Sequence, residues 1–335
     1  MYYLKYRPQK ISELDNPKIR EMLSSILKSQ NMPHAFLFTG QRGTGKTSAA
    51  RILAKTLNCL KNQNDACNQC SICRQISTDS LSDVVELDAA SNRGIDDIKN
   101  LIKEAHFSPM IAKYKIFIID EAHMITQDAF NALLKTLEEP PKQTIFILAT
   151  TNPEKLPDTI KSRCMRINFG TLKQADIISM LNRIKTAEGL SVDSKVLKTI
   201  AEASSLSFRD AAKILEELVS LNKLNYTQAV EHLYTRSHEK LLELLLTANA
   251  DKALEWIDEF FNQGGDIKTL ITNLLKELKT KAVLYIQKKD KKQLAKTTAL
   301  MKLLQQAYKE LKYTPYEIIP LELAVIEFYN QFRSD

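Results

Sequence analysis

The stretch AFLFTGQRGTGKTSAARILAKTL (residues 35–57) decides the fold of this chain. It starts with a short apolar run, passes through a glycine-rich turn, and ends in a helical pattern. A glycine-rich turn between a strand and a helix is the setting in which backbone N–H groups and a helix N-terminus bind phosphate. The alternative is a chance match of a glycine-rich turn, and the flanking strand and helix weigh against it.

Within GQRGTGKT (40–47), the glycines allow backbone N–H groups to turn inward around phosphate oxygens. Lys46 is expected to reach the β- and γ-phosphates of a nucleotide, and the Thr47 hydroxyl is expected to bind Mg²⁺. The residues predicted to bind nucleotide in this segment are Gly40, Gln41, Arg42, Gly43, Thr44, Gly45, Lys46, Thr47 and Ser48.

Further short apolar runs follow the first one, with helical patterns between them. They are DVVEL (83–87), KIFIID (115–120), TIFILAT (144–150) and MRINF (165–169). One intervening pattern, TQDAFNALLKTLEE, places its apolar residues on one helical face before Pro140 and Pro141. Strands that alternate with helices predict a parallel sheet covered on both faces, so we expect an α/β domain over residues 1–169.

After Gly170 the strand signals disappear, which predicts a small helical domain over residues 170–235. Its helices are expected at 172–188, at 194–203 and from near Ser207. Residues 236–335 form longer amphipathic patterns, broken at QGGD (263–266), KKDKK (288–292) and YTPYE (313–317). These last helices either pack only on one another or also associate with copies of the chain, and apolar patterning does not separate the two possibilities.

The composition is that of an ordinary globular protein, with 335 residues of which 44% are hydrophobic and 26% charged. A formal net charge of +7 permits acidic partners such as nucleic acid without identifying one. The N-terminus, MYYLKYRPQKISEL, lacks the layout of a signal peptide, and no window approaches the roughly 18 apolar residues of a membrane span. We therefore expect a cytoplasmic protein without a membrane partner.

Polar residues stand at the predicted ends of two strands. IFIIDEAH (116–123) places Asp120 and Glu121 at such an end, where parallel sheets carry their chemistry. Asp120 is expected to help hold Mg²⁺ and Glu121 to orient an attacking water, although a loop or cap role is the alternative. In ILATTNP (147–153), Thr151 is expected to sense the γ-phosphate or this water, although threonine at a strand end also forms simple turns.

Two arginines are notable in the segments 158–169 and 208–218. In FRDAAKILEEL (208–218), Arg209 lies in the first turn of a helix, where the helix dipole opposes it and either Asp210 or a phosphate should compensate it. In DTIKSRCMRINF (158–169), Arg163 has no acidic residue beside it with which to pair.

The cysteine spacing predicts a metal site. Four of five cysteines read C-x₇-C-x₂-C-x₂-C at Cys59, Cys67, Cys70 and Cys73, and four thiolates this close can surround Zn²⁺. A ferredoxin-type run would continue with a further Cys and Pro, which CRQIST does not. Structural zinc is favoured over an iron–sulfur cluster and over unliganded thiols.

A third polar cluster, in LDAASNRGIDDIKNLI (87–102), presents Ser91, Asn92 and Arg93 at the expected start of a helix. Donors in this position can hold a DNA phosphate. The alternative is simple N-capping by Ser91 or Asn92.

Together these segments resemble the gamma/tau subunits of bacterial DNA polymerase III clamp loaders, which are AAA+ ATPases. The order and spacing hold from about residue 4 to residue 220. The segments that carry the resemblance are GQRGTGKT, the four-cysteine run, DEAHMITQDAFNALLKTLEEPP, FILATTNPEKLPDTIKSRC and FRDAAKILEEL.

The resemblance implies a RecA-like AAA+ ATPase domain with an inserted zinc module, a helical lid domain and an all-helical collar. It further implies ATP-driven opening of a ring-shaped sliding clamp and its release on primer–template DNA. The implied cofactors are ATP, Mg²⁺ and Zn²⁺. The implied partners are delta and delta-prime subunits, further copies of the chain, the beta sliding clamp, primer–template DNA, and single-stranded-DNA-binding protein through accessory subunits.

Three residue roles also come from the resemblance. Arg163 matches the arginine finger that reaches the ATP of a neighbouring subunit, and Arg209 matches the sensor arginine of the lid. Arg7 and Pro8 match the segment beside the adenine. By this resemblance the chain is expected to end after the collar, which would correspond to a gamma-length form or to a longer protein cut to that length.

Three rival functions differ in the residues that they require. A delta-prime-like subunit would not hydrolyse ATP, and the presence of Lys46, Thr47, Asp120 and Glu121 together argues against it. A branch-migration helicase should carry a winged DNA-binding module after the lid, where this chain offers amphipathic helices. A purely zinc-dependent binding module does not need the phosphate-binding loop.

Overall fold

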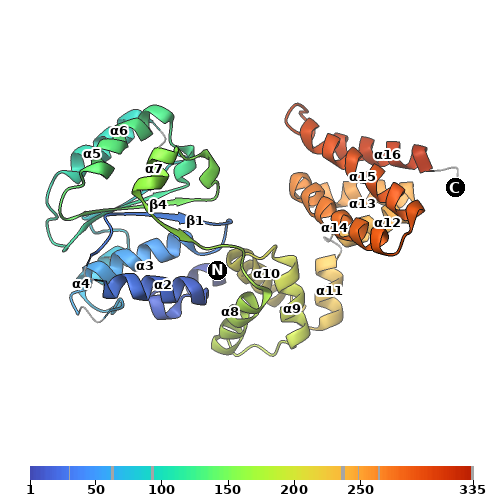
Figure 1. Cartoon of the computed structure of the whole chain (residues 1–335). Coiled ribbons are helices and arrows are strands. Elements are labelled where there is room, and N and C mark those ends of the chain that lie inside the picture. The colour runs from blue at the N-terminus through green and yellow to red at the C-terminus, as the bar shows by residue number, and fades with distance from the viewer. Residues whose placement is uncertain are drawn as a thin grey trace. The chain divides into compact units, whose positions relative to one another are not determined.

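A computed structural model describes residues 1–29, 31–61, 64–91, 94–234, 238–247, 249–262 and 265–332. Contacts within the chain divide it into two compact units, Met1–Asn225 and Tyr226–Asp335. Figure 1 shows both units. The predicted domain boundaries after residues 169 and 235 stay predictions.

The first unit is built on a parallel sheet with the strand order β2-β3-β4-β1-β5. The strands are β1 (Ala35–Thr39), β2 (Val84–Asp88), β3 (Lys115–Asp120), β4 (Thr144–Thr150) and β5 (Met165–Asn168). All five predicted strands are confirmed, with β2 displaced by one residue. Because β1 pairs with β4 up to Thr39 and Thr150, the glycine-rich loop leaves the sheet beside the end of β4.

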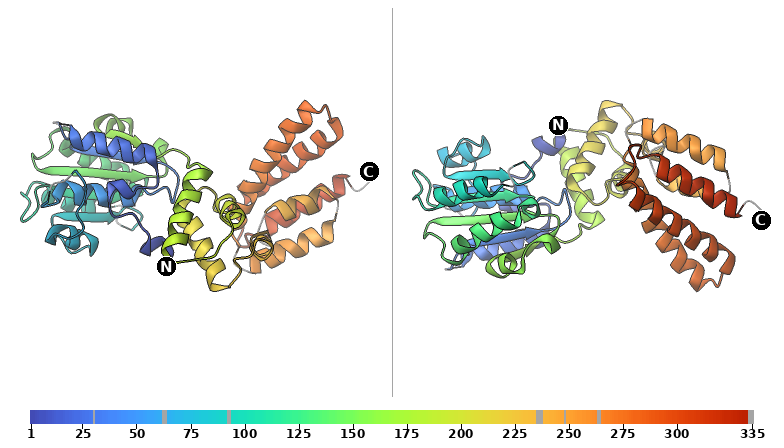
Figure 2. Two further views of the ribbon diagram at one scale, coloured as in Figure 1. Left: turned by 90° about the horizontal axis from the view of Figure 1, so that it is seen from below. Right: turned by 90° about the horizontal axis from the view of Figure 1, so that it is seen from above.

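Helices cover both faces of this sheet, as predicted (Figures 1 and 2). On one face lie α2 (Pro17–Lys28), α3 (Lys46–Asn58) and α4 (Ser71–Ser77), and on the other α5 (Ile95–Ala105), α6 (Gln127–Glu138) and α7 (Asp158–Arg163). Successive side chains of a strand point to opposite faces. Phe36 and Phe38 of β1 therefore pack in the core beneath α2 and α3, while Leu37 packs in the core beneath α5 and α6.

A helical segment follows β5 in the same unit. It comprises α8 (Gln174–Ala187), α9 (Ser194–Ala203) and α10 (Phe208–Ser220), at the three places where helices were predicted. The hydroxyl of Ser207 accepts a hydrogen bond from the Asp210 N–H at 3.2 Å and so fixes the start of α10. The short N-terminal helix α1 (Tyr2–Lys5) packs against α10.

The second unit is helical. Its helices are α11 (Tyr226–Tyr234), α12 (His238–Leu246), α13 (Ala250–Asn262), α14 (Ile267–Gln287), α15 (Lys291–Glu310) and α16 (Ile319–Phe332). The three predicted breaks are confirmed. Helix α14 begins after its cap Asp266 and α15 after its cap Asp290, and residues 313–317 lie between α15 and α16. Within the described ranges, no helix combines the length and apolar character that crossing a bilayer requires.

Candidate nucleotide and metal sites

The glycine-rich loop between β1 and α3 borders a cleft of about 500 Å³ in the first unit, a size typical of small-molecule sites. Gly43 and Gly45 have φ angles of 77° and 94°, in the left-handed region that favours glycine. This backbone brings the loop around to the N-terminus of α3, where unpaired N–H groups and the helix dipole favour an anion.

Lys46 opens α3 and is buried. Its Nζ donates hydrogen bonds of 2.9 Å to the carbonyl oxygens of Gly40 and Gln41. Burial lowers the pKa of Lys46, while the charges of Glu121 and Asp120 act in the opposite direction. The ammonium is therefore held inside the loop, in position to meet phosphate oxygens.

The Thr47 hydroxyl donates a 2.6 Å hydrogen bond to Oδ2 of Asp120 at the end of β3. A hydroxyl oxygen and a carboxylate oxygen are hard ligands of the kind that Mg²⁺ takes together with nucleotide phosphates. The chemistry of the pair fits Mg²⁺, and the ion when bound would offset phosphate charge. Its binding by Thr47 and Asp120 stays a prediction.

Glu121 is held by contacts from the next strand end. Its Oε2 accepts a 3.0 Å hydrogen bond from the Thr151 hydroxyl and lies 3.3 Å from Nδ1 of His123. Nδ1 of His123 also lies 3.1 Å from the Thr150 hydroxyl. The backbone of Glu121 is left-handed, with φ 47°, a conformation that is uncommon for a residue with a side chain. Sequence reasoning missed His123, although it lies in the same IFIIDEAH segment.

The start of α10 lies against the glycine-rich loop. The Phe208 N–H donates a 3.1 Å hydrogen bond to the Gly43 carbonyl, and a Cβ atom on Gly43 would lie only 2.0 Å from Oγ of Ser207. The Arg209 guanidinium stacks 5.0 Å from the centre of the Tyr3 ring, and both side chains line the cleft. Tyr3 had no signal in the sequence because its partner lies at the other end of the first unit's sequence.

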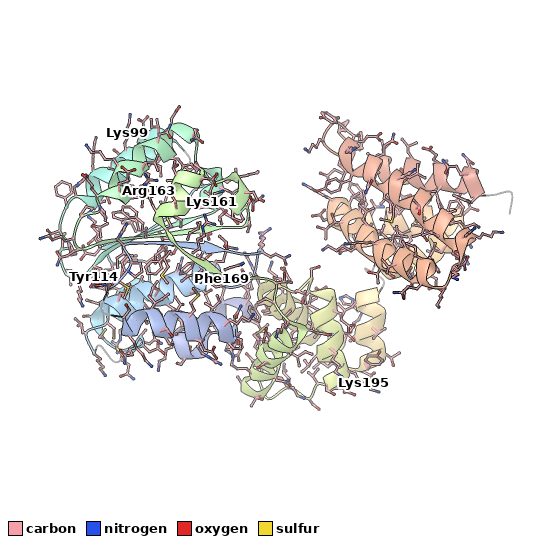
Figure 3. The ribbon with its side chains drawn as sticks, viewed as in Figure 1. Lys99, Tyr114, Lys161, Arg163, Phe169 and Lys195 are labelled. Carbon is pink, nitrogen blue, oxygen red and sulfur yellow. The ribbon has the colours of Figure 1, made fainter. Side chains whose placement is uncertain are left out.

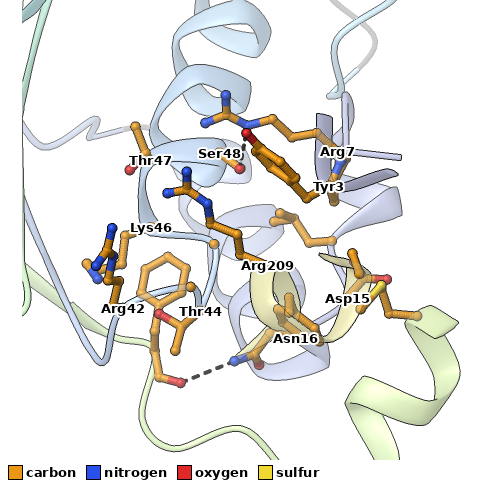
Figure 4. A pocket seen from close by; sticks show the side chains of 18 of the residues that line it. Tyr3, Arg7, Asp15, Asn16, Arg42, Thr44, Lys46, Thr47, Ser48 and Arg209 are labelled. Atoms are coloured by element: carbon orange, nitrogen blue, oxygen red, sulfur yellow. Dashed lines mark hydrogen bonds between the residues drawn. The ribbon is translucent and has the colours of Figure 1, made fainter. Parts of the chain in front are cut away.

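The N-terminal segment forms another wall of the cleft, as Figure 4 shows. Nε of Arg7 donates a 2.7 Å hydrogen bond to the Ser48 hydroxyl, and burial lowers the pKa of Arg7. Asn16 donates through Nδ2 to the Phe169 carbonyl at 3.2 Å.

Most of the predicted nucleotide-site residues meet in this cleft. Those that line it are Arg7, Pro8, Arg42, Gly43, Thr44, Gly45, Lys46, Thr47, Ser48, Asp120, Glu121 and Arg209. Gly40 and Gln41 contribute the carbonyl oxygens that hold Lys46, and Thr151 reaches the cleft through its hydrogen bond to Glu121.

Arg163 lies elsewhere. It ends α7, in the layer on the opposite face of the sheet from α3 (Figure 3), and it is not among the residues that line the cleft. Its guanidinium forms an ion pair with Glu138 of α6 and donates a 2.7 Å hydrogen bond to the Thr159 carbonyl. The expectation of an unpaired arginine is therefore wrong, because folding brings α6 alongside α7.

The four clustered cysteines converge as predicted. Their Sγ atoms all lie within 4.8 Å of one another, and those of Cys67 and Cys73 are 3.9 Å apart. In a tetrahedral site with Zn–S bonds of about 2.3 Å, sulfur atoms are separated by about 3.8 Å. The N–H groups of Gln69 and Cys70 donate to Sγ of Cys67 and lower its pKa to about 6. All five cysteines are free thiols, and the cluster fits Zn²⁺.

Ser91 lies in an exposed turn after β2, while Asn92 and Arg93 lie outside the described residues. Gly94, not Ser91, is the N-cap of α5, and its N–H donates to Asp97 at 3.3 Å. The alternative of capping by Ser91 is therefore wrong. The DNA contact stays a prediction.

A parallel sheet with a glycine-rich loop before α3, and a helical segment against that loop, form an α/β fold of the kind that binds nucleotides at the strand ends. The RuvB Holliday junction branch migration motor of Thermotoga maritima has this fold, with a TM-score of 0.50 at 15% identity over 72% of this chain and 79% of that chain. A likeness at this identity concerns the fold alone.

Sequence relatives identify the family. The DNA polymerase III subunit tau of Bacillus subtilis is 42% identical over 82% of this chain, and the subunit gamma of Buchnera aphidicola (subsp. Baizongia pistaciae) is 36% identical over 82% of this chain and 75% of its own length. Residues 15–173 match the family model described as DNA polymerase III, delta subunit. The chain belongs to the gamma/tau family of DNA polymerase III subunits. It spans 50% of the Bacillus subtilis relative.

Proposed function

We propose that the chain is the ATP-hydrolysing motor subunit of a DNA polymerase III clamp loader. It couples ATP binding and hydrolysis to the opening of a sliding clamp and its loading on primer–template DNA. The observation that carries this proposal is the placement of Lys46, the Thr47–Asp120 pair and Glu121 along one cleft. A subunit that does not hydrolyse ATP has no need for this complete set.

Each residue has a distinct part in the proposed reaction. Lys46 and the loop N–H groups bind the β- and γ-phosphates, and Thr47 and Asp120 hold Mg²⁺. Glu121 orients the attacking water, and Thr151 links this carboxylate to the end of β4. Arg209 adds positive charge from the helical segment, which supports its proposed role as a sensor of the nucleotide.

Arg163 is proposed to act in the site of a neighbouring subunit. Its position outside its own cleft and beyond the opposite face of the sheet supports a role in trans. An arginine placed against the transferred phosphoryl group is worth about 10³ to 10⁵ in rate. The proposed partners are therefore delta, delta-prime and further copies of the chain, together with the beta clamp and primer–template DNA.

The test is an ATPase assay on the full chain alone and then with its partner subunits, the sliding clamp and primed DNA. We expect the rate to rise when clamp and primed DNA are both present. A rate that stays flat, or one that responds to branched DNA without the clamp, would contradict the clamp-loader role.

The zinc site is tested separately by elemental analysis of the purified chain. We expect about one Zn per chain, since four thiolates complete one tetrahedral site. The Cys67→Ser and Cys70→Ser variants should lose it. Iron in place of zinc would overturn the proposed metal.

A further inference from the structure

A short segment at the N-terminus connects the nucleotide cleft with the cysteine cluster. We call residues 7–12 the strap. At one end, Arg7 and Pro8 line the cleft, and Arg7 bonds to Ser48 of α3. At its other end, the strap contacts the segment that holds the cysteines.

Asp65, two positions before Cys67, binds the far end of the strap. Its carboxylate accepts hydrogen bonds from the N–H groups of Ile11 at 2.7 Å and Ser12 at 3.0 Å, and another from Ala66 at 2.8 Å. Hydrogen bonds to a charged acceptor are about twice as strong as neutral ones. The backbone of the strap is therefore fixed by the same few residues that lead into the cysteine cluster.

Lys55 of α3 provides a second connection. This lysine is only 2% exposed, and its Nζ donates to Gln9 Oε1 at 2.5 Å and to Asn68 Oδ1 at 3.1 Å. The side-chain amide of Gln9 in turn donates to the Arg7 carbonyl at 3.1 Å. A continuous set of hydrogen bonds thus runs from the loop between Cys67 and Cys70 to the residue that walls the cleft.

The charge of Lys55 also suits the metal site. A buried ammonium is costly unless a negative group lies near it. The oxygens to which Lys55 donates, on Gln9, Asn68 and Ser77, are all neutral. Four thiolates outweigh the charge of one Zn²⁺, so a loaded site would be a net anion next to this cation. Lys55 would then stabilise the loaded site while holding the strap.

We propose that the cysteine module, when loaded with zinc, anchors the strap through Asp65 and Lys55, so that zinc binding strengthens nucleotide binding in the cleft. Asp65 and Lys55 are positioning residues in this scheme, because neither lines the cleft. The inference rests on the proposed nucleotide and zinc sites. It gives the zinc module a role in nucleotide binding by its own subunit.

The experiment measures ADP affinity of the full chain with zinc bound and after zinc removal. We expect roughly a fivefold or greater loss of affinity without zinc, at the lower end of ordinary coupling between sites. Since coupling is reciprocal, ADP should raise the affinity for zinc by the same factor, measured by competition with a chromophoric chelator.

Asp65→Ala is the decisive variant, because it keeps all four cysteines. It should retain about one Zn per chain, as the tetrahedral ligand set is intact, yet bind ADP more weakly than the wild type, toward the affinity of the zinc-free chain. Hydrogen exchange at the Ile11 and Ser12 amides should become faster in both. The matched control is Gln69→Ala. Gln69 lies between Cys67 and Cys70, and its side chain contacts Lys61 rather than the strap.

Two results would overturn the inference in different ways. If the wild-type chain carries zinc and binds ADP equally well with and without it, the coupling is absent and the proposed function is untouched. If the wild type binds no ADP, the proposed nucleotide site fails together with the inference.

Discussion

Glu121 is the residue on which the chemistry of the cleft most depends. Its carboxylate is held by Thr151 and lies beside His123, next to the carboxylate proposed to hold magnesium. We predict that Glu121→Gln preserves ATP binding, because Lys46, Thr47 and Asp120 stay in place, and lowers turnover by about 10² to 10⁴, the usual effect of a positioned acid or base.

Equilibrium binding of ATP and steady-state hydrolysis in the assembled complex check this prediction for Glu121. The exposed Glu154→Gln variant is the matched control, and it should change neither quantity. If the Glu121→Gln chain binds ATP and still hydrolyses it at the wild-type rate, another group must orient the attacking water.

Asp83 illustrates a residue that stabilises the fold rather than the site. It is buried just before β2, and its carboxylate accepts hydrogen bonds from the N–H groups of Met110, Ile111 and Ala112 at 2.7 to 2.9 Å. Burial alone would raise its pKa, but these donors and Lys115 hold the pKa below its ordinary value. Its stabilising effect is therefore present at neutral pH and is lost as the pH falls through the folded-state pKa.

We predict that Asp83→Asn lowers the free energy of unfolding at pH 7 by about 1 to 3 kcal/mol, the cost of weakening hydrogen bonds to a buried charged group. The difference from wild type should shrink below about pH 4, where the unfolded carboxylate takes up its proton. Urea unfolding at several pH values measures both effects, with the exposed Asp96→Asn as control. A difference that does not vary with pH would contradict the ionised state of Asp83.

At the scale of single residues, the sequence predicted those whose roles depend on residues close to them in the chain. The glycine-rich loop and the strand-end acids were found because their chemistry depends on neighbours in the chain. Tyr3 and the partner of Arg163 were not, since their contacts join segments far apart in sequence. His123 was also missed, although it contacts Glu121 two residues away. A side chain whose partner lies far away in the sequence produces no motif or spacing from which its role could be predicted.

Among the elements, the glycine-rich loop and α10 make a close contact at the cleft. Gly43 combines a left-handed φ of 77° with a close approach to Ser207. Gly189, which follows α8, has a similar φ of 63°, but a Cβ atom added there would meet nothing within 4 Å. A comparison of alanine substitutions at the two glycines therefore separates the cost of backbone strain from the cost of a steric clash.

We predict that Gly189→Ala lowers the free energy of unfolding by about 1 to 2 kcal/mol, the cost of a left-handed conformation for a residue with a side chain. Gly43→Ala should cost more, because Ser207 and the start of α10 must also move. Denaturant unfolding of the two variants measures the difference. Equal decreases in the free energy of unfolding would mean that α10 does not pack closely against the loop in solution.

The elements themselves were largely predictable. The five strands and the helices after β5 fall where apolar periodicity predicted them, since buried strands and amphipathic helices leave distinct patterns. The start of α5 was not predicted correctly, because Ser91 is a better capping residue than Gly94 in sequence terms. The structure instead satisfies the Gly94 N–H with Asp97.

For the whole molecule, the question is whether one chain holds a complete active site. We predict that Arg163→Ala leaves ATP binding to its own cleft nearly unchanged, because Arg163 does not line that cleft. Turnover of the assembled loader should fall by about 10³ or more if the arginine serves a neighbouring site.

The control for this prediction is Arg166→Ala, an exposed arginine in the adjoining strand β5 that donates to the Lys161 carbonyl. It should leave both binding and turnover unchanged. If Arg163→Ala instead abolished nucleotide binding by the isolated chain, the arginine would belong to its own site.

The hydrogen bond between Phe208 and Gly43 has a consequence for how this family can vary. Both partners are main-chain atoms, so any residue at position 208 except proline, which has no N–H, can make the link from α10 to the phosphate-binding loop. Exposed positions of α10 that do not line the cleft can therefore change while the connection persists. Position 43 has no such tolerance, because a side chain there would meet Ser207. We therefore expect substitutions that break the contact between the loop and α10 to concentrate on the loop side.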